Sequence, residues 1–486
     1  MITVQLNKAD FEYDIHSLVK AFFPSEDVAV FAGEKDVREV ISFRIFTDYK
    51  ENTIEISFVS ADENRKVLQN QTIEADFSDR KETKNRLKRA YYKMLSEYTG
   101  RTLPWGSLTG IRPTKIPMAF LEAGKTEDDI RNYMKETYFA SDEKIHLSIG
   151  IAKREQNLLR KIDYKNGYSL YIGIPFCPST CLYCSFTSYS LSMWAGRIDE
   201  YISALEKEID FAAEKFAGRH LNAVYIGGGT PTTLEPAQLH RLISRVKDGF
   251  DLSFCHEFTV EAGRPDSITE EKLDVLRKHG ISRISINPQT MNDETLKIIG
   301  RHHTAKQTED SFRLARKMGF DNINMDLIMG LPNEKLKDVE YTMRRILELS
   351  PDNLTVHSLA LKRAARLSMF RDEYQNLTFE NTKDTMDLTM DYAKRMGMEP
   401  YYLYRQKNMA GNFENVGYAK QGRAGVYNIL INEEVQTIVA LGAGSITKRV
   451  YPDGTIRRCE NVKDVAQYIA RIGEMIERKR VLLEDL

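Results

Sequence analysis

The sequence has little that would place the protein in a membrane, on a nucleic acid or outside the cell. Its 486 residues carry 69 Lys and Arg against 70 Asp and Glu, so no excess of positive charge favours a polyanionic partner. No uninterrupted apolar stretch is long enough to span a bilayer. The first residues, Met1–Leu6, form neither the basic nor the apolar region of a secretory signal. We therefore expect a cytoplasmic protein without a membrane span or a nucleic-acid partner.

Cysteine is also scarce, with five residues in the whole chain, which fits a reducing compartment better than a disulfide framework. Three of the five, Cys177, Cys181 and Cys184, have the spacing C-x3-C-x2-C directly after a short apolar run. The other two, Cys255 and Cys459, are isolated in the sequence. For these two we predict structural thiols.

Three closely spaced thiolates suit an iron–sulfur cluster better than the alternatives. Such clusters normally take one thiolate per iron, so three thiolates on four irons leave one iron open, as in a catalytic metal site. A structural zinc site would need a fourth ligand nearby, but the flanking histidines are His146 and His220. A disulfide would leave one thiol over, and a C-x2-C redox pair would leave Cys177 unexplained. The spacing favours a cluster, with zinc as the alternative.

From about residue 168 onward, strand-like runs alternate with helical patterns, as in βαβ units on a parallel sheet. The predicted strands are Tyr168–Ile174, Ala223–Ile226, Glu257–Glu261, Arg283–Asn287, Ile323–Ile328 and Asn353–Leu359. The predicted helices between them are Arg197–Phe216, Pro236–Val246, Glu270–His279, Ala305–Met318 and Leu336–Leu349. Six such units predict an α/β fold with a partial (βα)6 barrel resembling a TIM barrel. Active sites in such barrels lie at the carboxyl ends of the strands.

Polar or glycine-rich segments follow the predicted strands at those ends. The second strand ends in Gly227-Gly228-Gly229-Thr230, where the glycines let the backbone turn tightly and approach a ligand. Alone, such a triplet is most often a turn. The later strands carry or precede Glu261, Asn287-Pro288-Gln289, Arg301, Asp326 and His357. One strand-end carboxylate is usually a cap or an ion pair, but polar residues at four consecutive strand ends indicate a binding site.

The run from Tyr171 to Cys184, with Tyr183 before the third cysteine, resembles the cluster loop of radical S-adenosylmethionine enzymes. Within them it is similar to the oxygen-independent coproporphyrinogen III oxidases and their relatives, over roughly residues 165–450. The resemblance implies a 4Fe-4S cluster on Cys177, Cys181 and Cys184, with one open iron and S-adenosyl-L-methionine as cofactor. The positions that match the cofactor-binding residues of the family are Tyr171, Gly228, Gly229, Thr230, Glu261, Gln289, Arg301, Asp326, Ala360 and Ile446.

The resemblance also implies a reaction. A reduced cluster would cleave S-adenosylmethionine to methionine and a 5′-deoxyadenosyl radical, which takes a hydrogen from a propionate of coproporphyrinogen III. Loss of carbon dioxide then leaves a vinyl group, and two such steps give protoporphyrinogen IX. The implied partners are this tetrapyrrole and an electron donor such as flavodoxin or ferredoxin. No residue is assigned a catalytic role beyond the cofactor ligands, because the cofactor carries the chemistry.

The chain departs from the family pattern in two ways. The oxidases proper carry another cysteine two residues after the third, where this chain has Phe186, and the haem-chaperone and haem-modifying relatives also lack that cysteine. In addition, about 165 residues precede the cluster loop, and with the segment Trp105–Lys115 they resemble the HemZ-type branch of coproporphyrinogen dehydrogenases. Three functions stay open: oxidative decarboxylation of coproporphyrinogen III, a haem-binding chaperone, and a radical methyltransferase acting on haem or a porphyrin.

Pattern and composition divide the chain into four parts. Residues 1–100 are predicted to be an α/β domain, residues 101–165 a connector that is turn-rich and then helical, residues 166–360 the barrel, and residues 361–486 a region that covers the substrate. Within the first part, strands are predicted at Val28–Phe31, Glu39–Phe46 and Asn52–Val59, and a helix at Arg80–Tyr98.

Cationic and aromatic side chains in the last part would suit a tetrapyrrole with four carboxylates. They are Lys362, Arg363, Arg366, Tyr401, Tyr402, Tyr404, Arg405, Lys407, Tyr418, Lys420, Arg423 and Tyr427. A solvated, turn-rich region is the alternative interpretation. The adjacent His302 and His303 point in different directions on most backbones, and we predict a supporting role for both.

Overall fold

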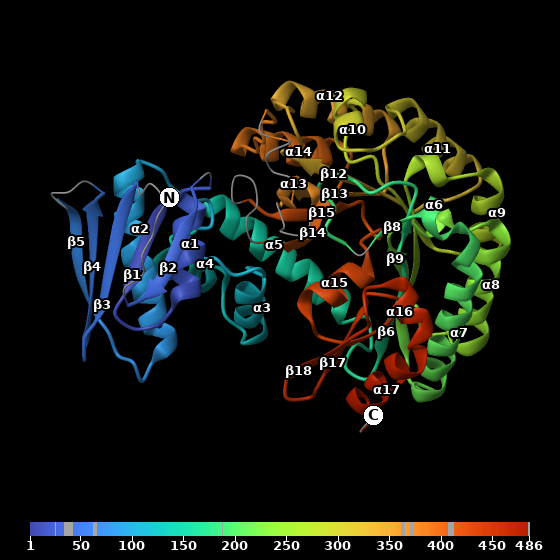
Figure 1. The fold of residues 1–486 in the computed structure, drawn as a ribbon, viewed down its shortest axis with the longest axis horizontal. Helices are drawn as coiled ribbons and strands as arrows, with labels where there is room; N and C mark the ends of the chain where they lie inside the picture. Colours follow the sequence, from blue (N-terminus) through green and yellow to red (C-terminus); the bar gives the residue numbers. More distant parts are fainter. Residues whose placement is uncertain are drawn as a thin grey trace. The chain divides into compact units, whose positions relative to one another are not determined.

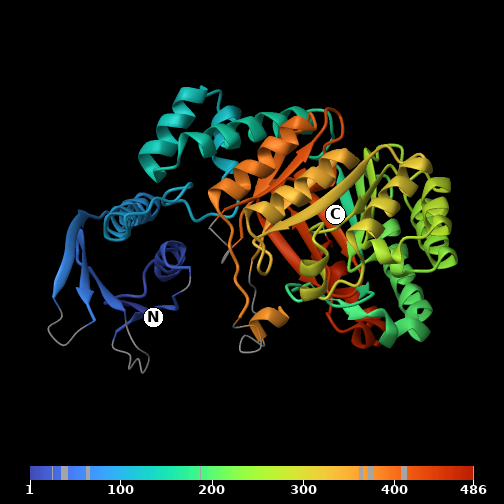
Figure 2. The same cartoon turned by 90° about the horizontal axis from the view of Figure 1, so that it is seen from above.

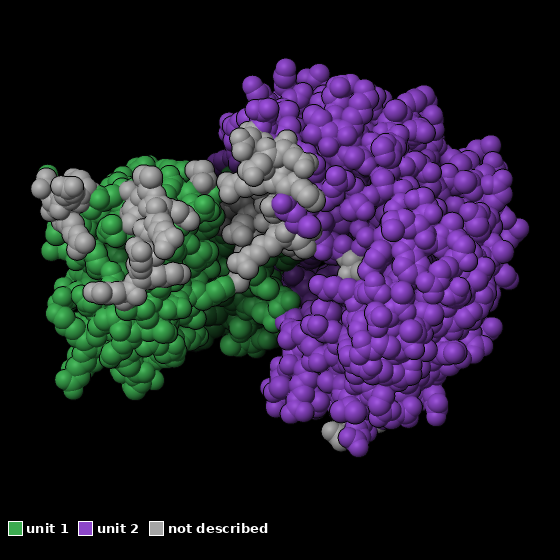
Figure 3. Space-filling model, in the orientation of Figure 1, with its two compact units in different colours: residues 1–152, 404–414 green, residues 153–403, 415–486 purple. Residues whose placement is uncertain are grey.

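The computed structural model describes residues 1–24, 26–33, 42–61, 66–186, 188–360, 365–369, 374, 376–406 and 413–484. The chain forms two compact units, residues 1–152 with 404–414 and residues 153–403 with 415–486 (Figure 3). The four-part division predicted from the sequence is finer and stays a prediction. Among the described residues, no helix combines the length and apolar content that crossing a bilayer requires.

The first unit is built on a five-stranded mixed sheet with the strand order β2-β1-β3-β4-β5 (Figure 1). Strand β1 pairs in parallel with β2 and β3, whereas β3, β4 and β5 form an antiparallel meander. The strands are β1 Ile2–Leu6, β2 Val28–Ala32, β3 Phe43–Tyr49, β4 Thr53–Ser60 and β5 Val67–Glu74. The helices are α1 Glu12–Phe22, α2 Arg80–Thr99, α3 Lys115–Glu122 and α4 Glu127–Tyr138. Helix α5, Asp142–Leu159, begins in this unit and ends in the second.

Alternation along β3 and β4 turns one face of this sheet into a hydrophobic core. Ile45 and Ile56 are buried from the strands, and Leu87, Tyr91 and Leu95 are buried from helix α2. The spacing of four residues on α2 places its apolar side chains on one face. Burial of one sheet face is the arrangement that the sequence pattern predicts. The strands β1 and β5 were not predicted, and residues 39–41 of the expected strand at 39–46 lie outside the described residues.

The second unit contains an eleven-stranded sheet with the order β14-β15-β13-β12-β11-β10-β9-β6-β16-β17-β18. Its centre is six parallel strands with helices along their outer side (Figures 1 and 2). These strands are β6 Tyr168–Ile174, β9 Leu221–Gly228, β10 Glu257–Gly263, β11 Arg283–Ile286, β12 Ile323–Met329 and β13 Asn353–Ser358. The helices between them are α7 Ile198–Lys215, α8 Pro236–Gly249, α9 Glu270–Lys278, α11 Ala305–Lys317 and α12 Leu336–Leu349.

This architecture confirms the predicted α/β fold with a partial barrel and an additional N-terminal α/β sheet. The predicted bounds of the six strands and five helices differ from the observed ones by three residues at most. Local signals explain the accuracy. For example, the Thr269 hydroxyl accepts a hydrogen bond from the Lys272 amide and so caps helix α9.

Five further strands of the C-terminal part join the sheet at its two ends and were not predicted. They are β14 Glu399–Tyr404, β15 Asn415–Ala419, β16 Thr437–Leu441, β17 Ile446–Val450 and β18 Ile456–Glu460. Strand β15 lies antiparallel to β13, whereas β16 lies parallel to β6. The C-terminal part therefore extends the sheet at both ends. Helices α13 Arg366–Met369, α14 Lys383–Arg395, α15 Val426–Glu433, α16 Val465–Ala470 and α17 Ile472–Leu482 accompany these strands.

Replacing Ile45 by Ala should lower the free energy of unfolding of the first unit by about 2–5 kcal/mol, because it leaves a cavity in the core. The only two tryptophans are Trp105 in the first unit and Trp194 in the second. In a Trp194→Phe background, Trp105 fluorescence therefore reports urea unfolding of the first unit. The exposed Val67→Ala is the control, with an expected change within about 0.5 kcal/mol. Equal midpoints for the two variants would contradict the core assignment.

Candidate functional site

The residues singled out by the sequence gather where the parallel strands of the second unit end. The cysteine loop, residues 175–188, follows β6, and Gly228 ends β9. Glu261 lies near the carboxyl end of β10, Asp326 lies at the middle of β12, and Gln289 follows β11. Because parallel strands all end at one edge of a sheet, five segments distant in sequence meet there.

The three thiols of the cysteine loop are unbridged and close enough to influence one another. Cys177, Cys181 and Cys184 are all free, and the Cys184 amide donates to the Cys181 carbonyl at 3.1 Å in a tight turn. Burial raises the pKa of the Cys177 thiol to about 12, and the neighbouring Cys181 and Cys184 raise it further. Burial also raises the pKa of the Cys184 thiol. Ionising these thiols therefore requires a positive partner such as a metal.

The cysteine loop is tied to the ends of two strands by polar contacts. The Ser179 hydroxyl donates to the Gly300 carbonyl at 2.8 Å, and the Arg264 guanidinium donates to the Ser179 hydroxyl at 2.7 Å. Arg264 is buried and forms an ion pair with Asp266 at 2.6 Å. These contacts join the loop to Arg264, the residue after β10, and to Gly300, which follows helix α10 (Asp293–Ile298). Sequence reasoning missed Arg264, although a charged residue directly after a buried strand was a signal.

The glycine triplet is required by a close approach of backbones. The Gly229 amide donates to the Ile174 carbonyl at 2.8 Å, and the Thr230 amide donates to the Phe176 carbonyl at 2.7 Å. A Cβ on Gly229 would lie 2.5 Å from the Phe176 oxygen, so no other residue fits without a backbone shift. The Thr230 hydroxyl donates to the Cys177 sulfur at 3.6 Å. The end of β9 therefore supports the first cysteine directly.

Arg301 lies beside the cysteine loop as a buried cation. Its guanidinium donates to the Asn287 carbonyl at 2.5 Å. Burial disfavours its charge, but Tyr183 and Cys181 beside it more than compensate, so that its pKa is raised. The structure thus brings Arg301 to Cys181, where a fixed positive charge offsets the negative charge of thiolates. His303, two residues on, is buried and its pKa is lowered to about 3, chiefly by burial and then by Arg301.

Two carboxylates stand at the same edge of the sheet. The Tyr225 hydroxyl donates to Glu261, and the Asn324 amide donates to Asp326 at 2.7 Å. Burial raises the pKa of Glu261 to about 7, the charge of Asp326 raises it further, and hydrogen bonds from Tyr225 and the Gly228 backbone oppose the rise. Glu261 and Asp326 are therefore neighbours whose charges interact. Such a pair suits a cationic group between them.

Gln289 combines two features typical of a residue held for a ligand. Its backbone has φ of +69°, which is rare for a residue with a side chain. Its amide donates to the Asp326 carbonyl at 3.0 Å, and its carbonyl accepts from the Ile328 amide at 3.0 Å, which fixes the strained turn. Its buried side-chain oxygen has no hydrogen-bond partner among the described residues. Such an oxygen needs a donor, which a bound molecule would supply.

Three tyrosines form a stack beside these carboxylates. The ring of Tyr225 lies 4.6 Å from that of Tyr427 and 6.2 Å from that of Tyr171, with interplanar angles of 22° and 14°. Tyr171 and Tyr225 come from β6 and β9, and Tyr427 comes from α15. The stack provides an apolar wall next to Glu261. Sequence reasoning named Tyr171 and Tyr427 but missed Tyr225, because the partner of a strand residue depends on register.

Ala360 and Ile446 are also near strand ends. Ala360 follows β13 by one residue and is half-buried, and Ile446 opens β17 with 41% of its surface exposed. Phe186, at the place of the additional cysteine of the oxidases, is 71% exposed. The binding roles of Ala360 and Ile446 stay predictions.

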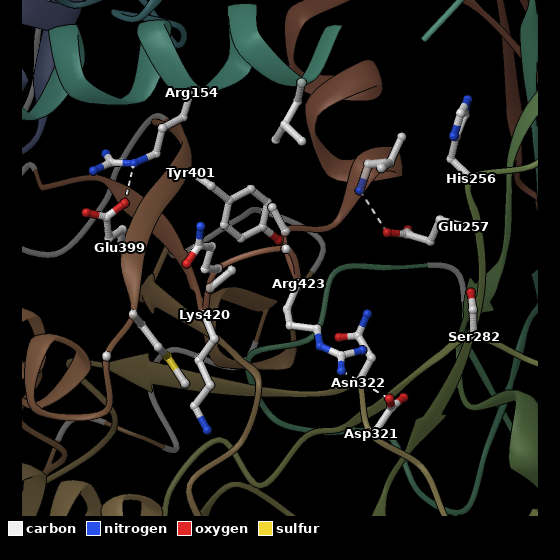
Figure 4. A pocket seen from close by; sticks show the side chains of 18 of the residues that line it. Arg154, His256, Glu257, Ser282, Asp321, Asn322, Glu399, Tyr401, Lys420 and Arg423 are labelled. Atoms are coloured by element: carbon white, nitrogen blue, oxygen red, sulfur yellow. Dashed lines mark hydrogen bonds and ion pairs between the residues drawn. The ribbon is translucent and has the colours of Figure 1, made fainter. Parts of the chain in front are cut away.

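Several residues predicted to meet a substrate lie at the other end of the sheet. A cavity of about 1260 Å³ is lined by His256, Ser282 and Asn322, the residues directly before β10, β11 and β12 (Figure 4). Further lining residues include Glu257, Arg154, Tyr401, Lys420 and Arg423 (Figure 4). The cavity is therefore at the amino ends of the strands, the opposite edge of the sheet from the cysteine loop. A role of Tyr401, Lys420 and Arg423 toward a substrate stays a prediction.

Two of the arginines that line this cavity have acidic partners. Arg154 pairs with Glu399 at 2.9 Å and Arg423 pairs with Asp321 at 3.0 Å, as the dashed lines and labels in Figure 4 indicate. Arg405, predicted with them, belongs to the first unit, where its guanidinium donates to the Leu108 carbonyl at 2.6 Å. Lys362, Arg363 and Lys407 lie outside the described residues.

Arg366 opens α13 and is exposed. The next residue, Leu367, donates its amide to the Leu182 carbonyl in the cysteine loop at 3.1 Å. Arg366 therefore adjoins the cysteine loop, and it belongs to the cations that were predicted to suit the substrate.

The donor set at the carboxyl ends fits an iron–sulfur cluster with a small polar ligand beside it. Within the described ranges, no three His, Cys, Asp or Glu side chains converge as the ligands of one metal ion would. The thiolates of a cluster each bind a different iron and need no such convergence. Three unbridged thiols, the Thr230 hydroxyl on Cys177, and the cation of Arg301 match the charge of a cluster. The unpartnered oxygen of Gln289 and the two carboxylates match an ammonium group.

Comparison with known proteins agrees with this chemistry. The model of the radical SAM superfamily matches residues 171–346. The oxygen-independent coproporphyrinogen-III oxidase-like protein HemZ of Bacillus subtilis (strain 168) is 41% identical over 411 residues, which are 84% of this chain and 82% of that protein. Heme chaperone HemW of the same organism is 35% identical over 310 residues, which are 63% of this chain and 76% of that protein.

A likeness in fold extends to a solved structure. The coproporphyrinogen III oxidase HemN from Escherichia coli, described as a radical SAM enzyme, matches with a TM-score of 0.52 and 24% identity. The match covers 66% of this chain and 73% of that chain. At this level of identity the likeness concerns the fold.

The raised pKa of Glu261 predicts a pH-dependent contribution to stability. Because the pKa rises from its ordinary 4.5 to about 7 in the folded protein, folding favours the protonated form. The contribution is fully present below the lower value and is lost as the pH rises through about 7. In cluster-free protein, the free energy of unfolding of wild type minus that of Glu261→Gln should fall between about pH 5 and pH 8. Urea titrations across this range measure it, and a constant difference would contradict the burial of Glu261.

Proposed function

The chain belongs to the radical SAM superfamily, within the group that includes the coproporphyrinogen-III oxidase-like protein HemZ, and on this basis we propose that it oxidatively decarboxylates coproporphyrinogen III to protoporphyrinogen IX. The observation that carries the proposal is the meeting of three unbridged thiols with Gln289, Glu261 and Asp326 at one edge of the sheet. The match to HemZ over 82% of that protein supports the choice of a tetrapyrrole substrate.

Cys177, Cys181 and Cys184 hold the 4Fe-4S cluster in this proposal. Their thiols ionise when the metal binds, so cluster assembly releases protons from a buried site that otherwise disfavours thiolates. The hydroxyl of Thr230 donates to the sulfur of Cys177 and stabilises its negative charge. Arg301 adds a full positive charge beside Cys181.

In this proposal the glycine triplet and the two carboxylates would hold S-adenosylmethionine. Glu261 and Asp326 accept hydrogen bonds from its ammonium or ribose groups, and the oxygen of Gln289 gains the donor it lacks. Gly228, Gly229 and Thr230 present backbone without an intervening side chain. The stacked Tyr171, Tyr225 and Tyr427 exclude water from this side. When bound, the two cofactors supply a hydrogen-abstracting radical.

A haem carrier is the second candidate function. Two observations favour it: the 35% identity to heme chaperone HemW over 76% of that protein, and Phe186 in place of the additional cysteine of the oxidases. The cluster-binding residues would then be retained without turnover of coproporphyrinogen III. An electron donor of the flavodoxin or ferredoxin type belongs to the first candidate alone.

Anaerobic incubation with S-adenosylmethionine, a low-potential reductant and coproporphyrinogen III separates the candidates. Vinyl product together with methionine and 5′-deoxyadenosine supports the oxidase. Stable haem binding without cleavage of S-adenosylmethionine supports the carrier and contradicts the oxidase. Transfer of a labelled methyl group to the tetrapyrrole would contradict both and show a methyltransferase.

Cys181→Ala should abolish cluster absorbance and cleavage of S-adenosylmethionine, because the cluster loses one of three protein ligands. Cys255→Ala, which removes a thiol away from the loop, should keep the parental iron content. Iron analysis measures the iron content, and four irons per chain in Cys181→Ala would refute the ligand assignment.

Asp326→Ala should keep the parental iron content but bind S-adenosylmethionine about tenfold more weakly, the loss expected for one charge-assisted hydrogen bond. Equilibrium dialysis measures this affinity.

A further inference from the structure

A fully buried ion pair lies behind the turn that precedes Ile446. Lys479 on α17 and Glu208 on α7 are 2.6 Å apart, and neither side chain has any exposed surface. Removing two charges from water is costly, so a buried pair is weak evidence for stability. A pair with all its hydrogen bonds made can instead fix one geometry of the segments around it.

The carboxylate of Glu208 is the centre of this arrangement. One oxygen accepts from the Gly442 amide at 2.8 Å and from the Tyr468 hydroxyl at 2.6 Å. The other accepts from the Asn461 amide at 2.8 Å and pairs with Lys479. Lys479 also donates to the Asn461 oxygen at 2.5 Å. Four donors from four different segments therefore meet on one carboxylate.

The segment Gly442-Ala443-Gly444-Ser445, here named the glycine turn, connects β16 to β17 and is bonded to Glu208 through the Gly442 amide. The Asn461 amide donates to the Gly442 carbonyl at 2.9 Å, and the Ser445 hydroxyl donates to the same carbonyl at 2.7 Å. Gly442 has φ of +98°, and a Cβ there would lie 2.5 Å from the Gly173 oxygen. The glycine turn is thus pressed against β6.

Tyr201 of α7 connects the glycine turn to the start of the cysteine loop. Its hydroxyl donates to the Gly173 carbonyl at 2.6 Å and accepts from the Ala443 amide at 3.1 Å. Its ring meets the ring of Phe176, the residue before Cys177, edge-on at 5.2 Å. One set of contacts therefore runs from the buried ion pair through the glycine turn to the first cysteine.

We propose that Glu208 and Lys479 are positioning residues that hold the glycine turn against the end of β6 and thereby pre-organise the binding of S-adenosylmethionine. This inference rests on the proposed cofactor site. A turn that is already ordered loses less conformational entropy when a ligand binds against it, so the affinity for the ligand is higher. The ion pair acts through Gly442 and Tyr201 and need not touch the ligand.

Lys479→Met tests the proposal, because it leaves the carboxylate of Glu208 without its cationic partner. Amide hydrogen exchange of the peptide that contains residues 440–446 should become about tenfold faster in the cluster-free protein, as expected when a hydrogen bond is weakened. The dissociation constant for S-adenosylmethionine of the anaerobic, cluster-loaded protein should rise about tenfold, with iron content unchanged.

Lys144→Met is the matched control. Lys144 pairs with Glu414 at 2.7 Å in the first unit, and both side chains are buried. This variant also breaks a buried ion pair, so it should lose stability, but exchange at residues 440–446 and affinity for S-adenosylmethionine should stay parental. Equal losses in Lys479→Met and Lys144→Met would overturn the proposal, and so would parental exchange and affinity in Lys479→Met.

Two further variants keep the test decisive. Glu208→Gln/Lys479→Met removes both charges but keeps an oxygen that accepts from Gly442 and Tyr468, so it should recover affinity to within about threefold of the parent. A double variant as weak as Lys479→Met would overturn the proposal. If Lys479→Met does not fold, Tyr468→Phe takes its place, because it removes one donor to Glu208. It should weaken the binding of S-adenosylmethionine about threefold. Parental exchange and affinity in Tyr468→Phe would then overturn the proposal.

The two proposals fail separately. A parent protein that assembles no cluster and binds no S-adenosylmethionine refutes the proposed function. Faster exchange at residues 440–446 in Lys479→Met would still support the role of the ion pair in ordering the turn. A parent that binds S-adenosylmethionine, with a Lys479→Met variant that binds it equally well, refutes only the positioning role.

Discussion

The candidate site depends on one contact between backbones, the approach of the β9 end to the start of the cysteine loop. Strand β6 pairs with β9 up to Ile174 and Gly228, and beyond that pair Gly229 and Thr230 donate to the carbonyls of Ile174 and Phe176. This approach is possible only with glycine at position 229. It places the Thr230 hydroxyl on Cys177, so the cysteine loop and the glycine triplet form one structure rather than two motifs.

Burial makes the acidic groups at this edge of the sheet harder to ionise, but it strengthens their interaction with a cation once they are ionised. It raises the pKa of both Cys177 and Glu261 and so favours the neutral form of each. The same low polarity strengthens the interaction of these groups, once ionised, with a bound cluster or an ammonium group. Arg301 keeps its charge despite burial because Tyr183 and Cys181 are beside it. Ionisation of Cys177 and Glu261 is therefore favoured when a positive partner binds beside them.

The sequence predicted what depends on local pattern. The cysteine spacing, the strand that precedes it and the alternation of strands and helices are local, and the barrel strands and helices were predicted to within three residues. Contacts over long sequence separations could not be predicted in this way. Strand β16 joins β6 from more than 260 residues later, and nothing in its own residues specifies that partner. The stacking of Tyr225 on Tyr427 and the hydrogen bond from Arg264 to Ser179 likewise join residues that are far apart in the sequence.

The distribution of cations bears on where a substrate with several carboxylates would be recognised. Lys420 and Arg423 lie at the amino ends of the strands, and Arg423 is paired with Asp321. Arg264 and Arg301, at the carboxyl ends, are buried and already support the cysteine loop. Neither pair is therefore placed to bind carboxylates beside the cysteine loop. Arg366 differs, because it is exposed and its neighbour Leu367 is bonded to Leu182 of the cysteine loop. If the proposed function holds, we therefore expect Arg366, rather than the residues at the strand ends, to recognise substrate carboxylates.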